Sequence, residues 1–388
     1  MRALFLTDSL SDLDGVGRYA MRLIAGLEVE LRLAGEPLEV EVLLSHKHRP
    51  TSSQVPAHWK VSVALPPDYF FYMTPLRYHV WHILGTLRAW RAARRADIVH
   101  AIKDFPHSRV ALAAAELAGK PCIATGHGTY TIQPLLDKRH ERRARATYAA
   151  FARMITVSQY TRRRLLELQK LDPARVEVIP NAVSAEHYVE PREVGKQAWH
   201  DTPFTLGIGE VKERKGHHLA LEAWCRVAPL VPGLQHFIVG RLSADEYEQR
   251  LKALVRKAGL EDRVHFLGNI TEDEKIDLLQ RARAFVHTPV TASDGGFEGF
   301  GIVYLEASAA GTAVLGTRDC GAEDAIVHGE TGYLCDQTVD AVTEALQSLV
   351  TDDELVAKMG AAGRVHAGAS SWEANAKRVL EIYREVLA

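Results

Sequence analysis

Two successive series of short apolar runs, each alternating with helical patterns, constrain the fold of this chain more than any other feature. The first series consists of RALFLT, LEVEVLLS, DIVHAI, PCIATG, RMITVS and VEVI. The second consists of FTLGIG, QHFIVG, RVHFLG, AFVHT, AVLGT and GYLC. Val/Ile-rich strands that alternate with helices indicate parallel sheets covered on both faces. We therefore predict an α/β fold of two Rossmann-like domains, whose parallel sheets face each other across a ligand-binding cleft.

Length and cysteine usage support this prediction. At 388 residues the chain is too long for one ordinary core. No apolar run reaches the roughly 20 residues of a membrane span, and Asp8 interrupts the first run, which favours a strand over a secretory signal. The four cysteines lack the spacing of a zinc site, so we expect reduced thiols in a cytoplasmic protein.

The apolar period is lost near residues 183–201, which indicates a linker. This predicts one domain at 1–188 and another at 189–371. A final amphipathic helix at 372–388 is expected to pack back onto the first domain.

Charge also divides the chain. Residues 1–190 hold 26 Lys and Arg against 19 Asp and Glu, a net charge of +7, and the remainder has a net charge of −9. A basic half and an acidic half suggest two domains that meet different partners.

The loop after the first strand, TDSLSDLDGVGRYA, places Gly15, Val16 and Gly17 at the start of a helix, where an anion can bind. The full G-x-G-x-x-G pattern is absent, so a nicotinamide cofactor is poorly supported. Asp12 and Asp14 could hold a metal, but such pairs are common in loops, and we predict no metal site.

Two further loops carry candidate site residues. His127 lies between two glycines after PCIATG, from where its imidazole could donate to a sugar hydroxyl or stabilise developing charge. The alternative is a turn histidine bonded to backbone. Lys212, Arg214 and Lys215 lie between a strand and a helix and suit a diphosphate, with a solvated basic turn as the alternative.

The stretch EGFGIVYLEASAAG holds Glu298 just before a helix and Glu306 inside it, two turns after Glu298. Both carboxylates could face one ligand. The alternative is that Glu298 caps the helix and Glu306 is a solvated surface residue.

Taken in order, these motifs resemble those of the retaining glycosyltransferases of family 4, which have the GT-B fold. The Glu-x7-Glu signature matches EGFGIVYLEASAAGTAVLGT. The supporting matches are GVGRYA, DIVHA, TGHGTY, ITVSQYTRRRL, VIPNAV, RKGHHLALEA, RVHFLG and HGETGYL, and they extend over nearly the whole chain.

The resemblance implies roles for the second domain, which would bind the nucleotide-sugar. Glu306 would accept hydrogen bonds from the ribose hydroxyls, and Glu298 would bind the transferred sugar and stabilise the charged transition state. Backbone N–H groups of Phe300, Gly301 and Ile302 would face the sugar and the β-phosphate, since helix N-termini favour phosphate.

The resemblance also implies the chemistry. Lys215 would neutralise the diphosphate leaving group. The loop from Gly15 to Gly17 and His127 would come from the acceptor-side first domain and close over the sugar. The reaction would be a front-face displacement with retention, without a metal or a cofactor, and with a UDP- or GDP-linked hexose as the expected donor.

One position departs from the family pattern. Glu210 stands where the family usually has an arginine, and an acid beside a diphosphate would repel it. We expect Lys212 or Arg214 to supply the missing cation, with impaired or unusual donor chemistry as the alternative.

The acceptor is suggested by residues 66–95, which are aromatic at the front and basic at the back, and by the basic clusters 138–145 and 161–165. Such a surface could rest on an anionic membrane, at its inner face, or bind a lipid-linked or anionic acceptor. Core aromatics with solvated arginines are the alternative. Nucleic acid is not expected as a partner, since the charge balance is near neutral and the sequence shows no nucleic-acid-binding motif.

The leading functional hypothesis is therefore a glycosyltransferase of surface glycan, lipopolysaccharide or glycolipid biosynthesis. A glycosyltransferase or phosphorylase that makes a small soluble glycoside or disaccharide is the first alternative. A non-catalytic sugar-nucleotide binder and an epimerase of the same architecture are the others.

Overall fold

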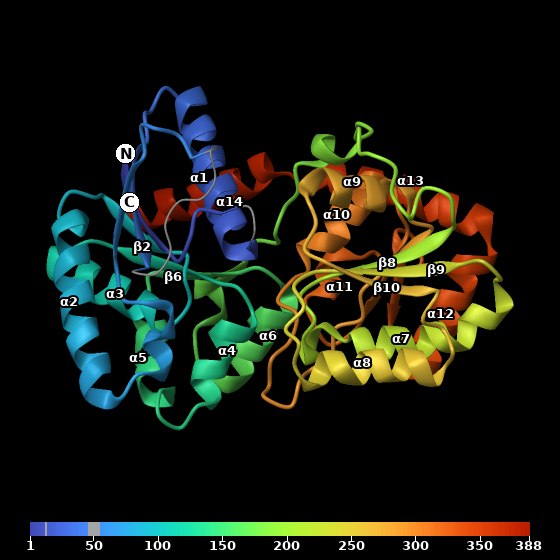
Figure 1. The fold of residues 1–388 in the computed structure, drawn as a ribbon. Helices are drawn as coiled ribbons and strands as arrows, with labels where there is room; N and C mark the ends of the chain where they lie inside the picture. The colour runs from blue at the N-terminus through green and yellow to red at the C-terminus, as the bar shows by residue number, and fades with distance from the viewer. Residues whose placement is uncertain (12–13, 46–54) are drawn as a thin grey trace. The chain divides into compact units, whose positions relative to one another are not determined.

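The computed structural model describes residues 1–11, 14–45 and 55–388, which form two compact units (Figure 1). Unit 1 comprises Met1–Asn181 and Trp372–Ala388, and unit 2 comprises Ala182–Ser371. The predicted pair of α/β domains with parallel sheets is confirmed.

The first unit ends at Asn181 rather than at residue 188. The reason is that the 3-10 helix η3 (Ala185–Tyr188) packs within unit 2. Tyr188 is buried there, and Nε2 of Gln280 donates to its carbonyl oxygen at 2.9 Å. Part of the expected linker is therefore folded against unit 2.

The sheet of unit 1 has the strand order β3-β2-β1-β4-β5-β6-β7 among the described residues, with every neighbouring pair parallel. Its strands are β1 (Arg2–Thr7), β2 (Glu39–Ser45), β3 (Lys60–Leu65), β4 (Ile98–Ala101), β5 (Cys122–Gly126), β6 (Arg153–Thr156) and β7 (Val176–Val178). In the register, Leu4 of β1 lies between Glu41 of β2 and Val99 of β4.

The helices of unit 1 cover this sheet. They are α1 (Gly15–Leu33), η1 (Asp68–Tyr72), α2 (Pro75–Ala93), α3 (His107–Ala118), α4 (Thr129–Leu136), α5 (Glu141–Ala150), α6 (Gln159–Leu168), η2 (Pro173–Arg175) and α14 (Trp372–Leu387). Helix α1 begins where the Asp14 side chain accepts a hydrogen bond from the Gly17 backbone, an N-cap of the usual kind.

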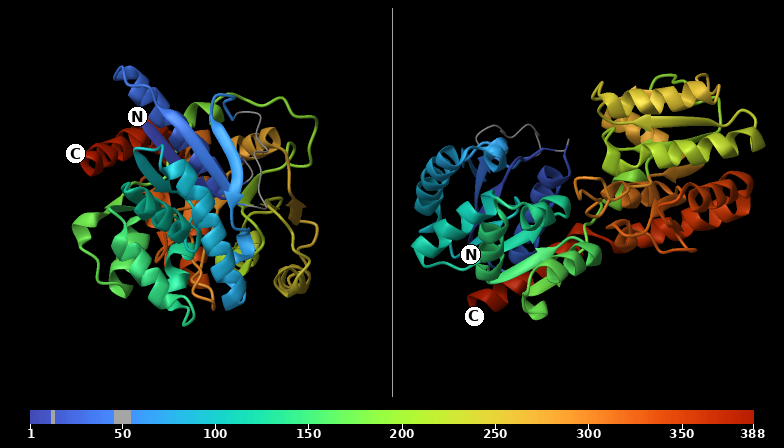
Figure 2. Two further views of the ribbon diagram at one scale, coloured as in Figure 1. Left: turned by 90° about the vertical axis from the view of Figure 1, so that its left-hand side faces the viewer. Right: turned by 90° about the horizontal axis from the view of Figure 1, so that it is seen from below.

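Helix α14 lies alongside α1, although the two are separated by most of the chain (Figures 1 and 2). A Cβ placed on Gly26 would come within 2.8 Å of Ala376, so a glycine permits the close packing of the two helices. Tyr383 of α14 is buried and its hydroxyl lies 2.8 Å from Nδ1 of His100 on β4.

The sheet of unit 2 has the order β10-β9-β8-β11-β12-β13 among the described residues, again with parallel neighbours. Its strands are β8 (Phe204–Ile208), β9 (Gln235–Val239), β10 (Val264–Gly268), β11 (Ala284–Val286), β12 (Val314–Thr317) and β13 (Gly332–Cys335). Its helices are η3, η4 (Glu213–Lys215), α7 (His217–Val227), η5 (Ala228–Leu230), α8 (Glu246–Lys257), α9 (Glu272–Arg281), α10 (Ile302–Ala310), α11 (Ala322–Ala325), α12 (Val339–Thr351) and α13 (Asp353–Ala369).

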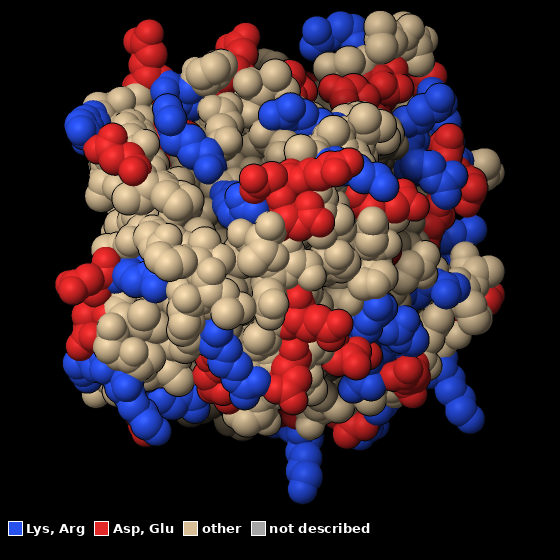
Figure 3. All heavy atoms as spheres, turned by 90° about the vertical axis from the view of Figure 1, so that its right-hand side faces the viewer, with Lys and Arg blue, Asp and Glu red and all other residues tan. Residues whose placement is uncertain are grey.

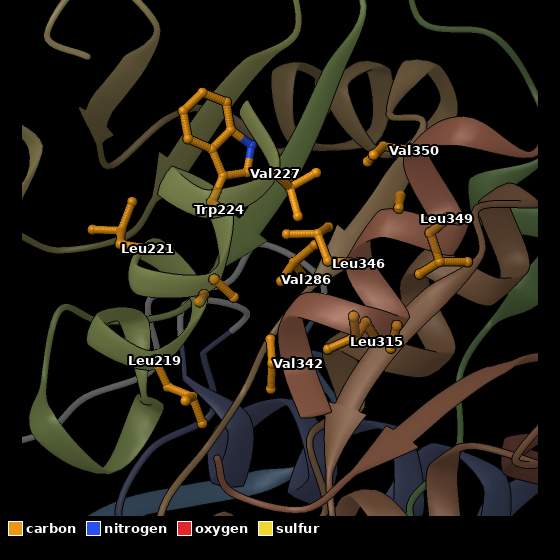
Figure 4. Packing of buried hydrophobic residues seen from close by; sticks show 14 of the residues in the cluster. Leu219, Leu221, Trp224, Val227, Val286, Leu315, Val342, Leu346, Leu349 and Val350 are labelled. Carbon is orange, nitrogen blue, oxygen red and sulfur yellow. The ribbon is translucent and has the colours of Figure 1, made fainter. Parts of the chain in front are cut away.

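Figure 1 shows α9, α10 and α13 on one face of this sheet and α7, α8 and α12 on the other. On the second face, leucines and valines of α7 and α12 pack with Val286 of β11 and Leu315 of β12 (Figure 4). Trp224 is 1% exposed and its indole N–H donates to the Thr205 hydroxyl at 3.1 Å. This close-packed apolar layer holds the sheet in one position, and with it the loops at the ends of its strands.

Acidic and basic side chains are interspersed over the face of the molecule drawn in Figure 3. Within the part of the chain that the structure describes, no helix is long and apolar enough to cross a membrane.

Both sheets contain one point at which the strand order reverses. In unit 1 it lies between β1 and β4, and in unit 2 between β8 and β11. Ligands of open α/β sheets bind at such points, outside the carboxyl ends of the strands. The loops that follow these four strands are therefore where a site is expected.

Candidate functional site

At the reversal point of unit 2, Lys215 meets Glu298. Lys215 ends the short helix η4 that follows β8, and Glu298 lies in the loop between β11 and α10. The Nζ atom of Lys215 is 2.5 Å from Oε2 of Glu298, with side chains 15% and 10% exposed. Two residues that the sequence singled out are thus brought together as a buried ion pair.

Glu298 has two further cationic or hydrogen-bonding neighbours. Nε2 of His287 lies 3.3 Å and the Arg214 guanidinium 3.8 Å from its Oε2 atom. Burial would raise the pKa of Glu298, but Lys215, His287 and Arg214 outweigh that effect and hold the pKa well below its usual range. Glu298 is therefore ionised and surrounded by donors.

Two glycines let the loops approach each other. Gly216 has φ 67°, and a Cβ there would lie 1.7 Å from the carbonyl oxygen of Thr288 in the opposite loop. Gly301 has φ 81°, and its Cβ would lie 2.6 Å from the ring of Tyr304. Tyr304 in turn donates to the His287 carbonyl oxygen at 2.6 Å, which fixes the loop that carries Glu298.

Phe300, Gly301 and Ile302 lead into α10, as the sequence predicted, so their backbone lies at the positive end of that helix. Phe300 is buried, and Ile302 is the first helical residue. Glu298 is close to this helix start, since a Cβ on Gly301 would lie 3.5 Å from Cγ of Glu298. An anion placed beside the helix start would therefore lie near the Lys215–Glu298 pair.

Glu306 lies on the buried side of α10 with an exposure of 1%, so it is not a solvated surface residue. Nζ of Lys275, from α9, is 3.2 Å from its Oε2 atom and 2.8 Å from Oε1 of Glu272. The same ammonium lies 5.6 Å from the ring centroid of Tyr188. Lys275 was not found from the sequence, because its partner is 31 residues away.

Glu210, the departure from the family pattern, is neutralised by two cations. Its Oε2 atom lies 2.7 Å from Nζ of Lys212, and its Oε1 atom accepts from the Arg241 guanidinium. Burial would raise the pKa of Glu210, but hydrogen bonds from Lys212 and Arg241 lower it below its usual value. Lys212 is thus committed to Glu210, whereas Arg214 lies near Glu298.

In unit 1, Gly15, Val16 and Gly17 begin α1 as expected. The Gly17 N–H donates to Oδ1 of Asp14 at 2.6 Å, so this donor already has an anionic partner. A Cβ on Gly17 would lie 2.4 Å from Oγ of Ser9, which requires a glycine there. Asp12 of the candidate Asp-x-Asp lies outside the described residues; those described contain no group of three or more potential metal ligands.

His127 follows β5, where the sequence placed it. Its Nε2 lies 2.9 Å from the Ile102 carbonyl oxygen, and its ring packs edge-on against Tyr19 at 4.9 Å. Burial lowers the pKa of His127 to about 4, so the ring is neutral and Nε2 carries the proton given to Ile102. The remaining nitrogen accepts rather than donates, which matches the backbone-bonded alternative and removes the expected donation to a sugar hydroxyl.

At the reversal point of unit 1, Asp8 after β1 and Lys103 after β4 form a second ion pair, 2.8 Å between Oδ2 and Nζ. These residues border a pocket of about 330 Å³ within unit 1. Neither residue is among the candidate site residues predicted from the sequence, although each comes directly after an apolar run, which is the signal that could have found them.

Comparison with known proteins assigns both halves. Residues 13–187 match the model of Glycosyltransferase Family 4, and residues 190–366 match that of Glycosyl transferases group 1. The chain belongs to the glycosyltransferases of GT-B fold. The two matches meet close to the boundary between units 1 and 2.

Curated relatives of this glycosyltransferase include the D-inositol 3-phosphate glycosyltransferase of Corynebacterium urealyticum, 32% identical over 46% of this chain and 42% of the relative. The GDP-mannose-dependent alpha-(1-6)-phosphatidylinositol monomannoside mannosyltransferase of Mycolicibacterium smegmatis is 31% identical over 56% of this chain and 57% of the relative. The matched region thus spans about half the length of these relatives.

Solved structures share the whole fold. Anabaena HepE in complex with UDP and glucose superposes with a TM-score of 0.78 at 17% identity, covering 99% of this chain and all of that one. Sucrose-phosphate synthase from Thermosynechococcus elongatus gives 0.75 at 20% identity, covering 100% and 99%. At these identities the likeness establishes the GT-B fold alone.

Proposed function

We propose that this protein is a retaining glycosyltransferase that moves a hexose from a UDP- or GDP-linked donor to an acceptor hydroxyl, in the biosynthesis of a glycan or glycolipid. The observation that carries the proposal is the buried Lys215–Glu298 pair at the reversal point of the unit 2 sheet, beside the start of α10. The relatives named above act on inositol or phosphatidylinositol acceptors according to their names, and one of them uses GDP-mannose.

In this proposal the diphosphate of the donor binds between Lys215 and the N-terminus of α10. A cation and a helix dipole are both more favourable when negative charge grows on the leaving group, so they lower the barrier rather than only tightening binding. Glu298 would accept from hydroxyls of the transferred sugar. Glu306, buried near the middle of α10, would accept from the ribose in place of part of its contact with Lys275.

The bonds change on one face of the sugar. The bond from the anomeric carbon to the diphosphate oxygen breaks, and the acceptor oxygen forms its bond to that carbon from the side that the diphosphate leaves. The departing phosphate oxygen takes the proton of the acceptor hydroxyl. No protein carboxylate is consumed, so the paired acid and nucleophile of glycosidases are not part of this scheme.

We also propose peripheral contact with an anionic membrane through α2, at the inner face of the membrane. Five large apolar residues at helical spacing are 42–76% exposed on this helix: Leu76, Val80, Ile83, Leu84 and Leu87. Exposed arginines at positions 77, 88, 91 and 94 lie on or at the end of the same helix. An apolar stripe with arginines nearby complements the acyl boundary and the anionic headgroups, respectively.

The donor is tested by thermal shift and calorimetry with UDP-, GDP-, ADP- and dTDP-sugars, together with Lys215→Ala. We expect one nucleotide class to raise the melting temperature. For that donor, Lys215→Ala should lose about 2–4 kcal/mol of transition-state stabilisation, the effect of one lost electrostatic donor. Wild-type turnover in Lys215→Ala, or product of inverted configuration by NMR, would remove the basis of the proposal.

A further inference from the structure

The pocket at the reversal point of unit 1 has the size of a small-molecule site and is built from separate segments. Its volume of about 330 Å³ is near the lower end of the roughly 300–1,000 Å³ range for ligand pockets. The lining comes from the loops after β1 and β4, from η1 and α4, and from the starts of α1 and α3. A site of this size accommodates about one sugar ring rather than an extended chain.

One wall of the pocket is aromatic. Phe71 and Phe105 pack edge-on with ring centroids 6.5 Å apart, and Tyr72 and Tyr130 also line the site. The tyrosines are 74% and 55% exposed, so they have surface left to cover a ligand. Flat aromatic surfaces suit the C–H faces of a pyranose or cyclitol ring, with the phenol groups as polar handles.

The polar lining is dominated by carboxylates. Asp8, Asp68 and Asp104 border the pocket together with one lysine, Lys103. Burial raises the pKa of Asp104 to about 7, so this carboxyl is only partly ionised near neutral pH. That lysine is already shared, since its Nζ lies 2.8 Å from Asp8 and 3.5 Å from Asp68. A phosphate or carboxylate placed here would meet like charges without a free cation among the described lining residues.

We propose that this pocket binds the acceptor substrate and that its bound part is an unphosphorylated sugar or cyclitol ring, neutral or amine-bearing. The ring's hydroxyl or ammonium groups donate to the carboxylates, and its apolar face covers the aromatic wall. This inference rests on the proposed glycosyltransferase function. It separates this chain from the relatives whose names specify phosphorylated inositol acceptors.

The test measures binding to the full chain, in the absence of donor, by saturation-transfer NMR and calorimetry. The probes are glucose, glucosamine and myo-inositol, each compared with its phosphorylated counterpart at constant ionic strength. We expect each phosphorylated probe to bind at least about tenfold more weakly than its parent, because like charges oppose it. Tighter binding of the phosphorylated probes, or no binding of any probe in the millimolar range, would overturn the proposal.

Matched variants locate the binding. Tyr72→Ala should weaken the favoured probe, whereas Tyr69→Ala, which removes an exposed aromatic of η1 outside the pocket lining, should not. Asp68→Asn should narrow the difference between parent and phosphorylated probes; an unchanged difference in a variant with the wild-type melting temperature counts against the proposal. Nucleotide-sugar binding is measured on the same samples, so a failed donor site and a failed acceptor site give different results.

Discussion

At the residue scale, the glutamate pair allows binding and turnover to be separated. Glu306→Ala should weaken nucleotide binding by about 1.5–3 kcal/mol, the value of a hydrogen bond to a charged group. Its partner Lys275 keeps Glu272, 2.8 Å away, so no ammonium is left unpaired. The matched control is Glu272→Ala, which removes the other, 48% exposed carboxylate from Lys275 and should leave nucleotide affinity unchanged.

Glu298→Ala should have the opposite signature. It leaves Lys215, His287 and Arg214 without their shared carboxylate, so the diphosphate should bind as well as in the wild type or better. Turnover should fall, because the transferred sugar loses its acceptor. Calorimetry and kcat are measured on the same preparation of each variant. If Glu298→Ala and Glu306→Ala both keep the nucleotide affinity and kcat of the wild type, the two glutamates have a structural role only.

Glu210 and Arg241 form a second pair whose role can be tested by exchange. Glu210→Arg places a third cation beside Lys212 and Arg241, so we expect crowding of the loop after β8 and lower activity. Stability should change by less than about 1 kcal/mol, because Arg241 is largely exposed and exposed pairs contribute little. The double variant Glu210→Arg, Arg241→Glu should recover activity.

Calorimetry with the donor decides between two explanations of Glu210. If the single variant Glu210→Arg binds the nucleotide more tightly than the wild type, the diphosphate site lacked a cation. The expectation that Lys212 or Arg214 supplies it is then wrong. Weaker nucleotide binding in the single variant, with recovery in the double variant, supports an ion pair in which Arg241 neutralises the charge of Glu210.

The candidate site residues that the structure brings together were found from the sequence where they belong to a local motif. Lys215, Glu298 and Glu306 follow this rule. Residues outside a local motif that pair over long sequence distances were missed. Lys275 lies 31 residues from its partner Glu306, and Lys103 lies 95 residues from its partner Asp8. The strand order joins these segments, and single-strand patterns contain no information about it. His127 was placed correctly, but its donor was already used by a backbone carbonyl that no pattern identifies.

At the element scale, β3 is the described strand that no predicted run covers. Three edge strands, β7, β10 and β13, do correspond to predicted runs, so an edge position alone does not hide a strand. Like them, β3 lies at an edge, and its residues are mostly half-buried or exposed. Its sequence KVSVAL therefore contains polar positions and does not read as a continuous apolar run.

The apolar stripe of α2 predicts salt-dependent membrane binding. Sedimentation with vesicles that contain anionic lipid should decrease as salt rises, since the Debye length falls from about 30 Å at 0.01 M to about 10 Å at 0.1 M. Leu76→Ser together with Ile83→Ser should weaken binding even at low salt. Leu33→Ser is the matched control, because Leu33 of α1 is 78% exposed, as Leu76 is at 76%, but lies outside the stripe. Equal losses in both variants would mean that α2 is not the contact.

At the scale of the whole molecule, the chain passes from unit 1 to unit 2 and returns with α14. Removing residues 372–388 should therefore lower the stability of unit 1 and leave that of unit 2 unchanged. It removes Tyr383 from His100 and Trp372 from the ring of Tyr19, 5.7 Å away between centroids. Limited proteolysis with mass spectrometry should show faster cleavage within residues 1–181 and unchanged cleavage within 182–371. Equal protection of both regions in the shortened chain would contradict this prediction. Adding a peptide of residues 372–388 should restore the protection of residues 1–181.

The position of α14 also sets the order in which the molecule can be completed as it leaves the ribosome. Residues 182–371 are synthesised between the two parts of unit 1. At about 5–20 residues per second, these 190 residues take roughly 10–40 s. During that time the nascent first unit carries α1 without the helix that covers Gly26, and by its end unit 2 has all its strands. The part of the protein that is translated first is thus the part that finishes folding last, and a chaperone that recognises the uncovered side of α1 would have that interval in which to bind.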